Sequence, residues 1–337
     1  MEKLQNPPDS AAPETRESED EPGSTRLLGR STAIDAVLQL IARVAPTEAT
    51  VLICGESGSG KELVARSIHE GSARRAGPFV AINCGALPPT LIESELFGYE
   101  KGSFTGAVGT HSGLIERAEG GTLFLDEVTE MPIDLQVRLL RFLETRSFYR
   151  IGGRQPLRSD LRVIAATNRN PGQAVRAGLL REDLLYRLAV FPIDVPPLRA
   201  RGSDAVLLGR HFLEELNRAH GTAKTFSAAS GAALRAHAWP GNVRELRNAV
   251  ERAFILSDDV LELEPDPEPV QGTAAGPPEL RIPIGTRLAE VERSLIEATL
   301  GHFMGNKRKT ADVLGCSLKT LYNKLAAYQR EDAPAAI

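Results

Sequence analysis

The sequence contains few cysteines and shows no metal-ligand spacing of histidine. Its 337 residues include three cysteines, Cys54, Cys84 and Cys316, which lie far apart and form no CxxC pair. This scarcity excludes a disulfide framework and predicts buried thiols in a reducing compartment. The six histidines are scattered, which argues against a histidine metal site.

Long apolar runs are also missing. No segment approaches the roughly 20 apolar residues that a membrane-spanning helix needs. The N-terminus lacks the apolar core of a secretion signal. We therefore expect a cytoplasmic protein without a membrane partner, and the length suits two or three domains.

Charge is unevenly distributed along the chain, although the formal net charge is only −4. Residues 1–25 carry seven acids against two bases, whereas residues 301–330 carry six bases against one acid. A basic block at the end of an acidic chain indicates a local site for a polyanion.

Apolar runs alternate with helical patterns between residues 27 and 196. This alternation predicts an α/β fold with a parallel sheet and helices on both faces. The runs are Thr50–Cys54, Phe79–Asn83, Thr122–Asp126, Leu161–Thr167 and Val190–Val195. After Pro196 and Pro197 we expect no further strand, because residues 197–256 have the three-and-four spacing of a helical subdomain.

Three further segments complete the organisation. Residues 1–26 form an acidic tail with few apolar side chains, which predicts disorder and is too short for an N-terminal receiver or sensory domain. Residues 257–285 predict an acidic, proline-rich linker, with seven acids and no base between Asp258 and Leu280. Residues 286–330 return to helical spacing and predict an all-α domain.

A glycine-rich loop directly follows the first apolar run. It consists of Gly55, Glu56, Ser57, Gly58, Ser59, Gly60 and Lys61, with Glu62 next. Glycines let backbone N–H groups surround phosphates, and the following helix adds positive potential at its N-terminus. The loop therefore predicts a nucleotide site in which Lys61 reaches the β- and γ-phosphates; a glycine-rich turn without a ligand is the alternative.

Two carboxylates, Asp126 and Glu127, end the third apolar run. Ligands of parallel sheets lie beyond the carboxyl ends of the strands, so both acids can face the phosphates. We expect Asp126 to hold Mg²⁺ and Glu127 to orient or deprotonate the attacking water. A solvated strand end is the alternative interpretation.

Between these two motifs lies the hexapeptide Gly102, Ser103, Phe104, Thr105, Gly106 and Ala107. Two glycines bracket a Phe-Thr pair, which predicts a flexible loop with an apolar tip. An exposed apolar tip is costly unless it meets a partner, and a buried phenylalanine in a surface turn is the alternative.

Over residues 27–256 and 286–328 the chain resembles the NtrC-like AAA+ activators of sigma-54 RNA polymerase. The family shares the glutamate at Glu62, and its hexapeptide usually has alanine where this chain has Ser103. The resemblance implies an AAA+ P-loop ATPase with a helical lid, which binds enhancer DNA and remodels the closed sigma-54 polymerase complex through the hexapeptide. The alternatives are a DNA-binding regulator of the same fold that does not act through sigma-54, and an AAA+ ATPase that acts on DNA itself.

The resemblance also implies roles for residues around the nucleotide. Asn168 corresponds to the sensor I position, and Arg244 to the sensor II position of the lid. Asn83 corresponds to the residue that restrains the catalytic glutamate. Arg181 and Arg187 correspond to arginine fingers that reach into a neighbouring subunit, which implies a head-to-tail ring with a hexamer as family precedent. A salt-bridged helix face is the alternative for the two arginines.

The C-terminal segment 305–325 resembles a Fis-type helix-turn-helix, with Gly315 at the turn and Ser317 as a cap. We expect Leu318, Leu321 and Leu325 to pack inward. The predicted DNA-binding residues are Lys307, Arg308, Lys309, Ser317, Lys319, Thr320, Tyr322, Asn323 and Lys324. Residues 288–303 are expected to pair two copies. Control is expected from a separate regulatory protein acting in trans, or from the abundance of the activator itself.

Overall fold

The computed structural model describes residues 27–104, 107–263, 285–303 and 307–331. The chain divides into two units, Met1–Glu268 and Pro269–Ile337, and each is considered by itself. Within the described ranges, no helix is long and apolar enough to cross a membrane.

The first unit is built around a five-stranded sheet with the order β2-β3-β6-β1-β7, in which every pairing is parallel. Its strands are β1 (Val51–Cys54), β2 (Phe79–Asn83), β3 (Thr122–Asp126), β6 (Arg162–Thr167) and β7 (Phe191–Asp194). The register places Asn83 opposite Asp126 and Cys54 opposite Thr167. The predicted strands and the parallel sheet are confirmed, and the carboxyl ends of the five strands lie at one edge.

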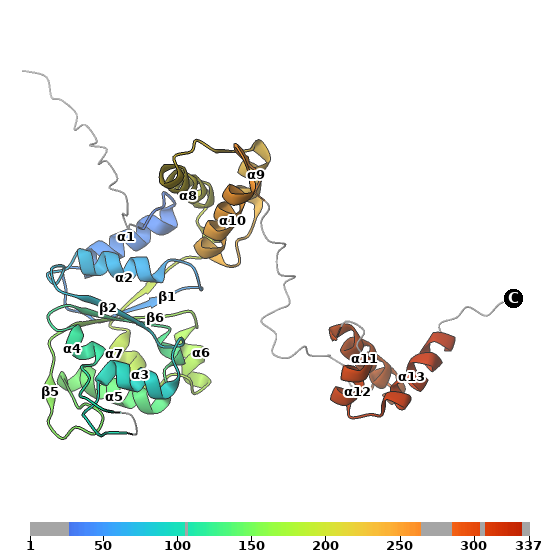
Figure 1. The fold of residues 1–337 in the computed structure, drawn as a ribbon, viewed down its shortest axis with the longest axis horizontal. Coiled ribbons are helices and arrows are strands. Elements are labelled where there is room, and N and C mark those ends of the chain that lie inside the picture. The colour runs from blue at the N-terminus through green and yellow to red at the C-terminus, as the bar shows by residue number, and fades with distance from the viewer. Residues whose placement is uncertain (1–26, 105–106, 264–284, 304–306, 332–337) are drawn as a thin grey trace, which may run out of the picture. The chain divides into compact units, whose positions relative to one another are not determined.

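Helices cover both faces of this sheet (Figure 1). On one face lie α1 (Thr32–Val44) and α2 (Lys61–Glu70), which share an apolar core with the sheet. The other face carries α3 (Pro89–Phe97), α4 (Leu114–Arg117), α5 (Ile133–Thr145), α6 (Pro171–Arg176) and α7 (Glu182–Leu188). Because β6 is buried along its whole length, it forms the centre of both cores. A short hairpin of β4 (Ser147–Phe148) and β5 (Leu157–Arg158) lies next to α5, and the turn η1 (Val128–Glu130) follows β3.

A helical subdomain follows the sheet. It contains the turn η2 (Leu198–Ala200), α8 (Asp204–His220), α9 (Ala228–Ala236) and α10 (Asn242–Leu256) around a core that includes the fully buried Trp239. The expectation that strands end at Pro197 is wrong, because β8 (Thr225–Phe226) pairs in parallel with β9 (Val260–Leu261). Pieces of two residues are too short to show a period of two in the sequence.

The helical subdomain also extends past residue 256, where the linker was expected to begin. Leu261 and Leu263 are buried in its core, and Ser230 Oγ accepts a hydrogen bond from Leu263 N at 2.7 Å. These two leucines alternate with acids, so composition alone assigned them to the linker. The remainder of that linker, 264–284, and the acidic tail, 1–26, lie outside the described residues.

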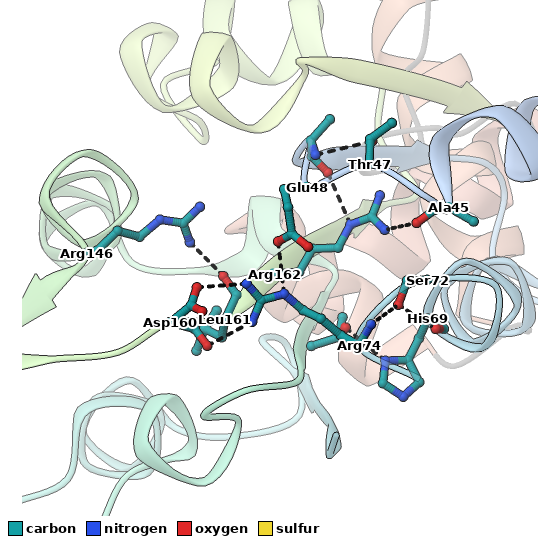
Figure 2. Close-up of polar contacts among 12 residues, drawn as sticks. Ala45, Thr47, Glu48, His69, Ser72, Arg74, Arg146, Asp160, Leu161 and Arg162 are labelled. Atoms are coloured by element: carbon teal, nitrogen blue, oxygen red, sulfur yellow. Dashed lines mark hydrogen bonds and ion pairs between the residues drawn. The ribbon is translucent and has the colours of Figure 1, made fainter. Parts of the chain in front are cut away.

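The amino ends of the strands are held by buried arginine contacts, far from the ends that carry the acids. Arg162, which is 1% exposed, begins β6 and donates to the carbonyl oxygens of Val44 and Ala45 at 2.9 Å and of Ala49 at 3.2 Å (Figure 2). The carbonyls of Val44 and Ala45 end α1, where a positive charge is favourable. Nearby, Arg74 pairs with Glu48 and Asp160. This network holds α1 against the sheet.

The three cysteines are free thiols. Burial raises the pKa of the Cys84 thiol to about 12 and is the main reason why the pKa of Cys54 rises to about 11. Both thiols therefore stay protonated near neutral pH and serve as small packing groups.

The second unit contains α11 (Leu288–His302), α12 (Lys307–Leu314) and α13 (Leu318–Glu331) around a small core with Ile296, Ala311 and Leu321. Between α12 and α13, Gly315 has φ of 67°, a conformation that glycine adopts at little cost. Ser317 Oγ accepts from Thr320 N at 3.1 Å and caps α13. Leu318 does not pack inward as expected and is 42% exposed, because the core centres one helical turn later on Leu321.

Candidate functional site

The glycine-rich loop joins β1 to α2 at the carboxyl edge of the sheet. Gly58 and Gly60 have φ of 75° and 103°, which lets the backbone turn sharply before α2 begins at Lys61. Lys61 is 7% exposed, and its ammonium donates to the carbonyl oxygen of Gly55 at 3.1 Å. The loop thus places the N-terminus of α2 and one lysine at a single point, as phosphate binding requires.

The acidic pair lies directly opposite this loop. Lys61 Nζ lies 3.3 Å from Glu127 Oε1, and the backbone N–H of Asn168 donates to Glu127 Oε2 at 3.0 Å. Glu127 N donates to Asp126 Oδ1 at 3.0 Å. Burial, and after it the charge of Glu127, raises the pKa of Asp126 above its usual value. Two adjacent carboxylates and a lysine therefore converge where the strands end.

Asn83 also reaches this edge, but it contacts a different acid from the one expected. Its Nδ2 donates to Asp126 Oδ2 at 3.2 Å, and its Oδ1 accepts from Gly85 N at 2.9 Å. Glu127 is held instead by Lys61 and by the backbone of Asn168. Because Asn83 and Asp126 are register partners on β2 and β3, their side chains meet more directly than Asn83 and Glu127 do.

A cleft of about 680 Å³ opens between the sheet edge and the lid. The predicted site residues in its lining are Ser57, Gly58, Gly60, Lys61, Glu62, Asn83, Asp126, Glu127, Asn168 and Arg244. Segments separated by almost two hundred residues therefore share one cleft. Gly55, Glu56 and Ser59 belong to the same loop but are not among the lining residues.

Sequence reasoning missed the apolar side of this cleft. A smaller pocket of about 140 Å³ lies beside it, with apolar walls from Leu27, Leu28, Leu63, Phe212 and Val243. Such walls suit a flat aromatic ring at the end of the phosphate loop. These residues come from four separate segments, so no local pattern in the sequence could have identified them together.

The lid contacts the phosphate loop through several polar groups. Arg244 Nη1 donates to Ser57 Oγ at 3.0 Å. Glu56 does not face the cleft but pairs with Arg199, which donates from Nη1 at 2.8 Å and lowers the pKa of the Glu56 carboxyl. Asn242 donates to the same carboxylate at 3.1 Å. The contributions of Arg199 and Asn242 were not foreseen from the sequence.

The two expected arginine fingers lie away from the cleft. Arg181 precedes α7 and pairs with Asp183 at 2.7 Å, and its side chain is 39% exposed. Arg187 is 57% exposed and lies 3.8 Å from Glu144. Neither lines the cleft of its own chain. Within one chain, therefore, the structure does not bring them to the nucleotide site.

The hexapeptide forms a loop with a half-exposed tip. Gly102 has φ of 81°, and its N–H donates to the carbonyl oxygen of Ala107 at 2.9 Å, which closes the loop. Phe104 is 47% exposed, and its ring meets the Tyr99 ring edge-on at 5.0 Å. Ala107 is buried at the base. Thr105 and Gly106 lie outside the described residues.

The stem of this loop is tied to the segment between β4 and β5. Glu100 N donates to the carbonyl oxygen of Ile151 at 3.0 Å. Arg150 pairs with Glu100 at 2.8 Å and with Glu116 at 2.6 Å. A Cβ at Gly152 would come within 2.7 Å of Ser103 Cβ, so the two segments touch closely. Movement of one segment must therefore affect the other.

Most expected DNA-binding residues lie on the exposed side of α12 and α13. Lys319, Thr320, Tyr322 and Asn323 are exposed, and Lys307 Nζ lies 4.7 Å from the centre of the Tyr322 ring. Lys324 instead pairs with Glu292 of α11 at 2.6 Å, which holds its ammonium against that helix. Lys309 Nζ lies over the Phe303 ring at 4.9 Å. The side chain of Arg308 is outside the described part of the chain.

A phosphate loop, an acidic strand end and a helical lid on a parallel sheet define the AAA+ class of P-loop ATPases. Family models divide the chain in the same way. Residues 27–194 match the Sigma-54 interaction domain, 199–274 match an AAA+ ATPase lid domain, and 287–328 match the bacterial regulatory proteins of the Fis family.

Similarity to known proteins identifies the family within the AAA+ class. The chain is 45% identical to the transcriptional regulatory protein FlbD of Caulobacter vibrioides, over 89% of this chain and 69% of FlbD. It is 44% identical to the regulator NtrC of Rhizobium meliloti (89% and 69%) and 48% identical to VnfA of Azotobacter vinelandii (90% and 58%). NtrX of Brucella abortus, crystallised in complex with ATP, aligns at 37% identity with a TM-score of 0.67, over 89% of this chain and 68% of NtrX.

The chain thus belongs to the NtrC-like family of sigma-54-dependent transcriptional activators, and it is an ATPase with a Fis-type DNA-binding domain.

Proposed function

We propose that this activator uses ATP hydrolysis to move the Phe104 loop against sigma-54 and so remodels the closed polymerase complex. The observation that carries the proposal is the half-exposed Phe104 at the tip of a loop whose stem is bonded to the ATPase domain. Loss of a γ-phosphate can switch such a loop between two positions. Residues 102–107, with Ser103 beside the tip, form the proposed contact.

The cleft supports the roles that we propose for the residues around the nucleotide. Residues 55–62 hold the phosphates, with Lys61 at the β- and γ-phosphates, and Arg244 touches the nucleotide from the lid. Glu127 orients or deprotonates the attacking water, and Asn168 senses the γ-phosphate. Asn83 restrains the acidic pair. The proximity of Lys61 to Glu127 supports this arrangement, because a phosphate arriving at Lys61 lies beside the base.

Mg²⁺ is the proposed metal, held by Asp126 together with the phosphates. The described residues contain no group of three or more acids, histidines or cysteines that could form a metal site alone. Mg²⁺ is commonly bound by one or two carboxylates plus substrate phosphates, which fits one acid at a phosphate loop. The raised pKa of Asp126 indicates a carboxylate that would gain from a nearby cation. When bound, the ion neutralises charge on the phosphates.

A ring completes the site in this proposal. The side chains of Arg181 and Arg187 are 39% and 57% exposed and do not line their own cleft, so they are available to a neighbouring subunit's nucleotide. Two guanidinium groups there would stabilise the charge of the transferred phosphoryl group. A head-to-tail contact of this kind closes into a ring, and we propose a hexamer assembled from dimers.

Enhancer DNA is the proposed ligand of residues 286–330, read by α13 and positioned by the basic residues of α12. Exposed Leu288 and Leu295 on α11 support pairing of two copies through this helix. Residues 27–263 belong to the remodelling ATPase, and the connection to the DNA-binding domain follows them. We place this activity in the bacterial cytoplasm, under the control of a separate regulatory protein or of the activator's abundance.

The substitution Phe104→Ala tests the proposal. ATPase activity should survive, because Phe104 lies outside the nucleotide cleft, while transcription from a sigma-54 promoter should disappear. Ile255→Ala, which removes an apolar side chain that is 73% exposed on the lid, is the matched control and should leave both activities unchanged. Normal sigma-54 transcription by the Phe104 variant would reject the loop as the contact and favour a regulator that does not act through sigma-54.

A further inference from the structure

Asn242 is a fully buried polar residue at the first position of α10. Its φ of 54° is left-handed, a conformation that asparagine adopts more readily than most residues. We propose that Asn242 is a positioning residue for ATP hydrolysis, which fixes the phosphate loop to the lid through Glu56. The inference rests on the proposed nucleotide site and adds a residue to it.

The side chain of Asn242 joins three segments that are far apart in the sequence. Nδ2 donates to Glu56 Oε2 and to the carbonyl oxygen of Ser57, each at 3.1 Å. Oδ1 accepts from Leu198 N at 2.8 Å, in the turn between sheet and lid. The N–H groups of the amide and one acceptor position of its oxygen are thus used for contacts between the phosphate loop, the connecting turn and the lid.

Backbone contacts around Asn242 bring the lid unusually close to the phosphate loop. Val243 N donates to the carbonyl oxygen of Gly58 at 3.0 Å. A Cβ on Gly58 would come within 2.4 Å of the carbonyl oxygen of Gly241, so only glycine fits there. The buried Arg201 also donates to the carbonyl oxygen of Ser59. The phosphate loop therefore cannot shift without moving the start of α10.

Through these contacts, Asn242 also controls the position of Arg244 relative to the phosphate loop. Arg244 lies two residues later in the same helical turn, and its Nη1 reaches Ser57 Oγ at 3.0 Å. Release of the Asn242 amide would let the loop and Arg244 drift apart. Small misplacements of this kind can slow an enzymatic step by about 100-fold, because catalysis depends on the alignment of the reacting groups.

A purely structural asparagine that starts a helix would need only its backbone and Oδ1. The contacts of Nδ2 with the phosphate loop are what distinguish a positioning role. Glu56 has a second partner in Arg199, so its carboxylate stays in place when the amide is changed. A test must therefore change the contacts of Nδ2 and keep both the hydrogen bond from Leu198 N–H to Oδ1 and the pairing of Glu56 with Arg199.

Asn242→Asp makes this change, since aspartate has nearly the same shape and also tolerates left-handed backbone. The new carboxylate still accepts from Leu198 N but faces the Glu56 carboxylate and the Ser57 carbonyl. We expect kcat/KM for ATP to fall about 10- to 100-fold, with weaker ATP binding as well as slower turnover. Gln39→Glu, the same change from amide to carboxylate at an exposed position of α1, is the control and should behave as wild type.

A second substitution supplies the discriminating readout. Adding Glu56→Gln to the Asn242→Asp variant reverses the pair, so that an amide at residue 56 faces a carboxylate at residue 242. We expect this double variant to recover at least about 10-fold in kcat/KM over Asn242→Asp alone. Loss of fold alone would lower the melting temperature in both variants and would not be rescued by Glu56→Gln.

The kinetics of each variant are measured on the whole chain with Mg·ATP as the probe. Thermal melting of the same samples is measured in parallel. Rescue by Glu56→Gln supports the inference. Wild-type kinetics in the Asn242→Asp variant, or a loss that Glu56→Gln leaves unchanged, would overturn it. If Asn242→Asp fails to fold, Asn242→Gly, which keeps the left-handed backbone, should show the same kinetic loss, and unchanged kinetics would equally overturn the inference. Absence of ATP turnover in the wild type would instead reject the nucleotide site itself.

Discussion

Glu127 has a left-handed backbone, with φ of 51°, directly after the buried strand β3. Such a conformation costs free energy for a residue other than glycine and is found preferentially at functional sites. Here it accompanies a carboxylate held between Lys61 and the N–H of Asn168. The residue thus has a constrained position before any nucleotide arrives.

The substitution Glu127→Gln should separate ATP binding from hydrolysis. Glutamine keeps the size of the side chain but cannot accept a proton from water, so turnover should fall about 100-fold or more. ATP affinity, measured by equilibrium binding of a fluorescent analogue, should remain close to that of the wild type. Steady-state hydrolysis at the wild-type rate would remove Glu127 from the proposed chemistry.

At the scale of elements, the connection between β4 and β5 holds the stem of the Phe104 loop. Arg150 bridges Glu100 before the loop and Glu116 after it. Its hydrogen bonds are the main reason why the pKa values of both carboxyls lie below their usual range. A carboxyl with a lowered folded-state pKa adds stability above its unfolded pKa, and this stability is lost as the pH falls through the folded value.

Acid should therefore lower the stability of the folded protein, because protonation of Glu100 and Glu116 removes their ion pairs with Arg150. As the pH falls below about 4.5, the unfolded-state range of a glutamate, the melting temperature of the wild type should drop more steeply than that of Arg150→Met. Arg158→Met, at an exposed position of β5, is the control and should follow the wild-type curve. Parallel curves for wild type and Arg150→Met across this range would show that the bridge contributes nothing to stability.

At the scale of the whole molecule, the exposed arginines require a second subunit if they act on ATP. Lys61→Ala removes the phosphate lysine, and Arg181→Ala removes a finger, so each variant alone should be inactive. Mixed together, some sites pair an intact phosphate loop with a finger from the other subunit. ATPase activity should then reappear, at a fraction of the wild-type rate that depends on the mixing ratio.

This complementation can be read by coupled ATPase assay, with size-exclusion chromatography to show that mixed rings form. An active Arg181→Ala variant, or mixed rings without any activity, would contradict action of Arg181 in trans. Phe104→Ala mixed with Lys61→Ala serves as a control, because the Phe104→Ala subunit keeps both its phosphate loop and its arginine finger and should retain ATPase activity in mixed rings.

The composition of individual segments explains why the main sheet could be predicted from the sequence. β1, β3 and β6 are buried on both faces and need no alternation, and the edge strands β2 and β7 are partly buried but also apolar, so composition identified all strands of the main sheet. β8 and β9 escaped notice, because two residues cannot establish a period. Leu318 was assigned to the core from its spacing, but its place at the start of α13 leaves it exposed.

The residues of the nucleotide-binding motifs could be identified from the sequence alone. Glycines at 58 and 60, the lysine after them and the acids at 126 and 127 have fixed local geometries, so their meeting at the sheet edge follows from strand order and polarity. Family, ATPase class and DNA-binding end were readable for the same reason. The roles of the individual site residues and the domain limits stay predictions.

Only the tertiary structure decided which distant groups share a contact. Asn83 meets Asp126, Lys324 meets Glu292, and Asn242 meets Glu56 because strand register and helix packing bring them within hydrogen-bonding distance. No local pattern encodes such pairs, since each partner satisfies its own segment's preferences equally well with solvent. The sequence by itself thus determined the chemistry available to this activator, and packing of separate segments determined which atoms can act on one another.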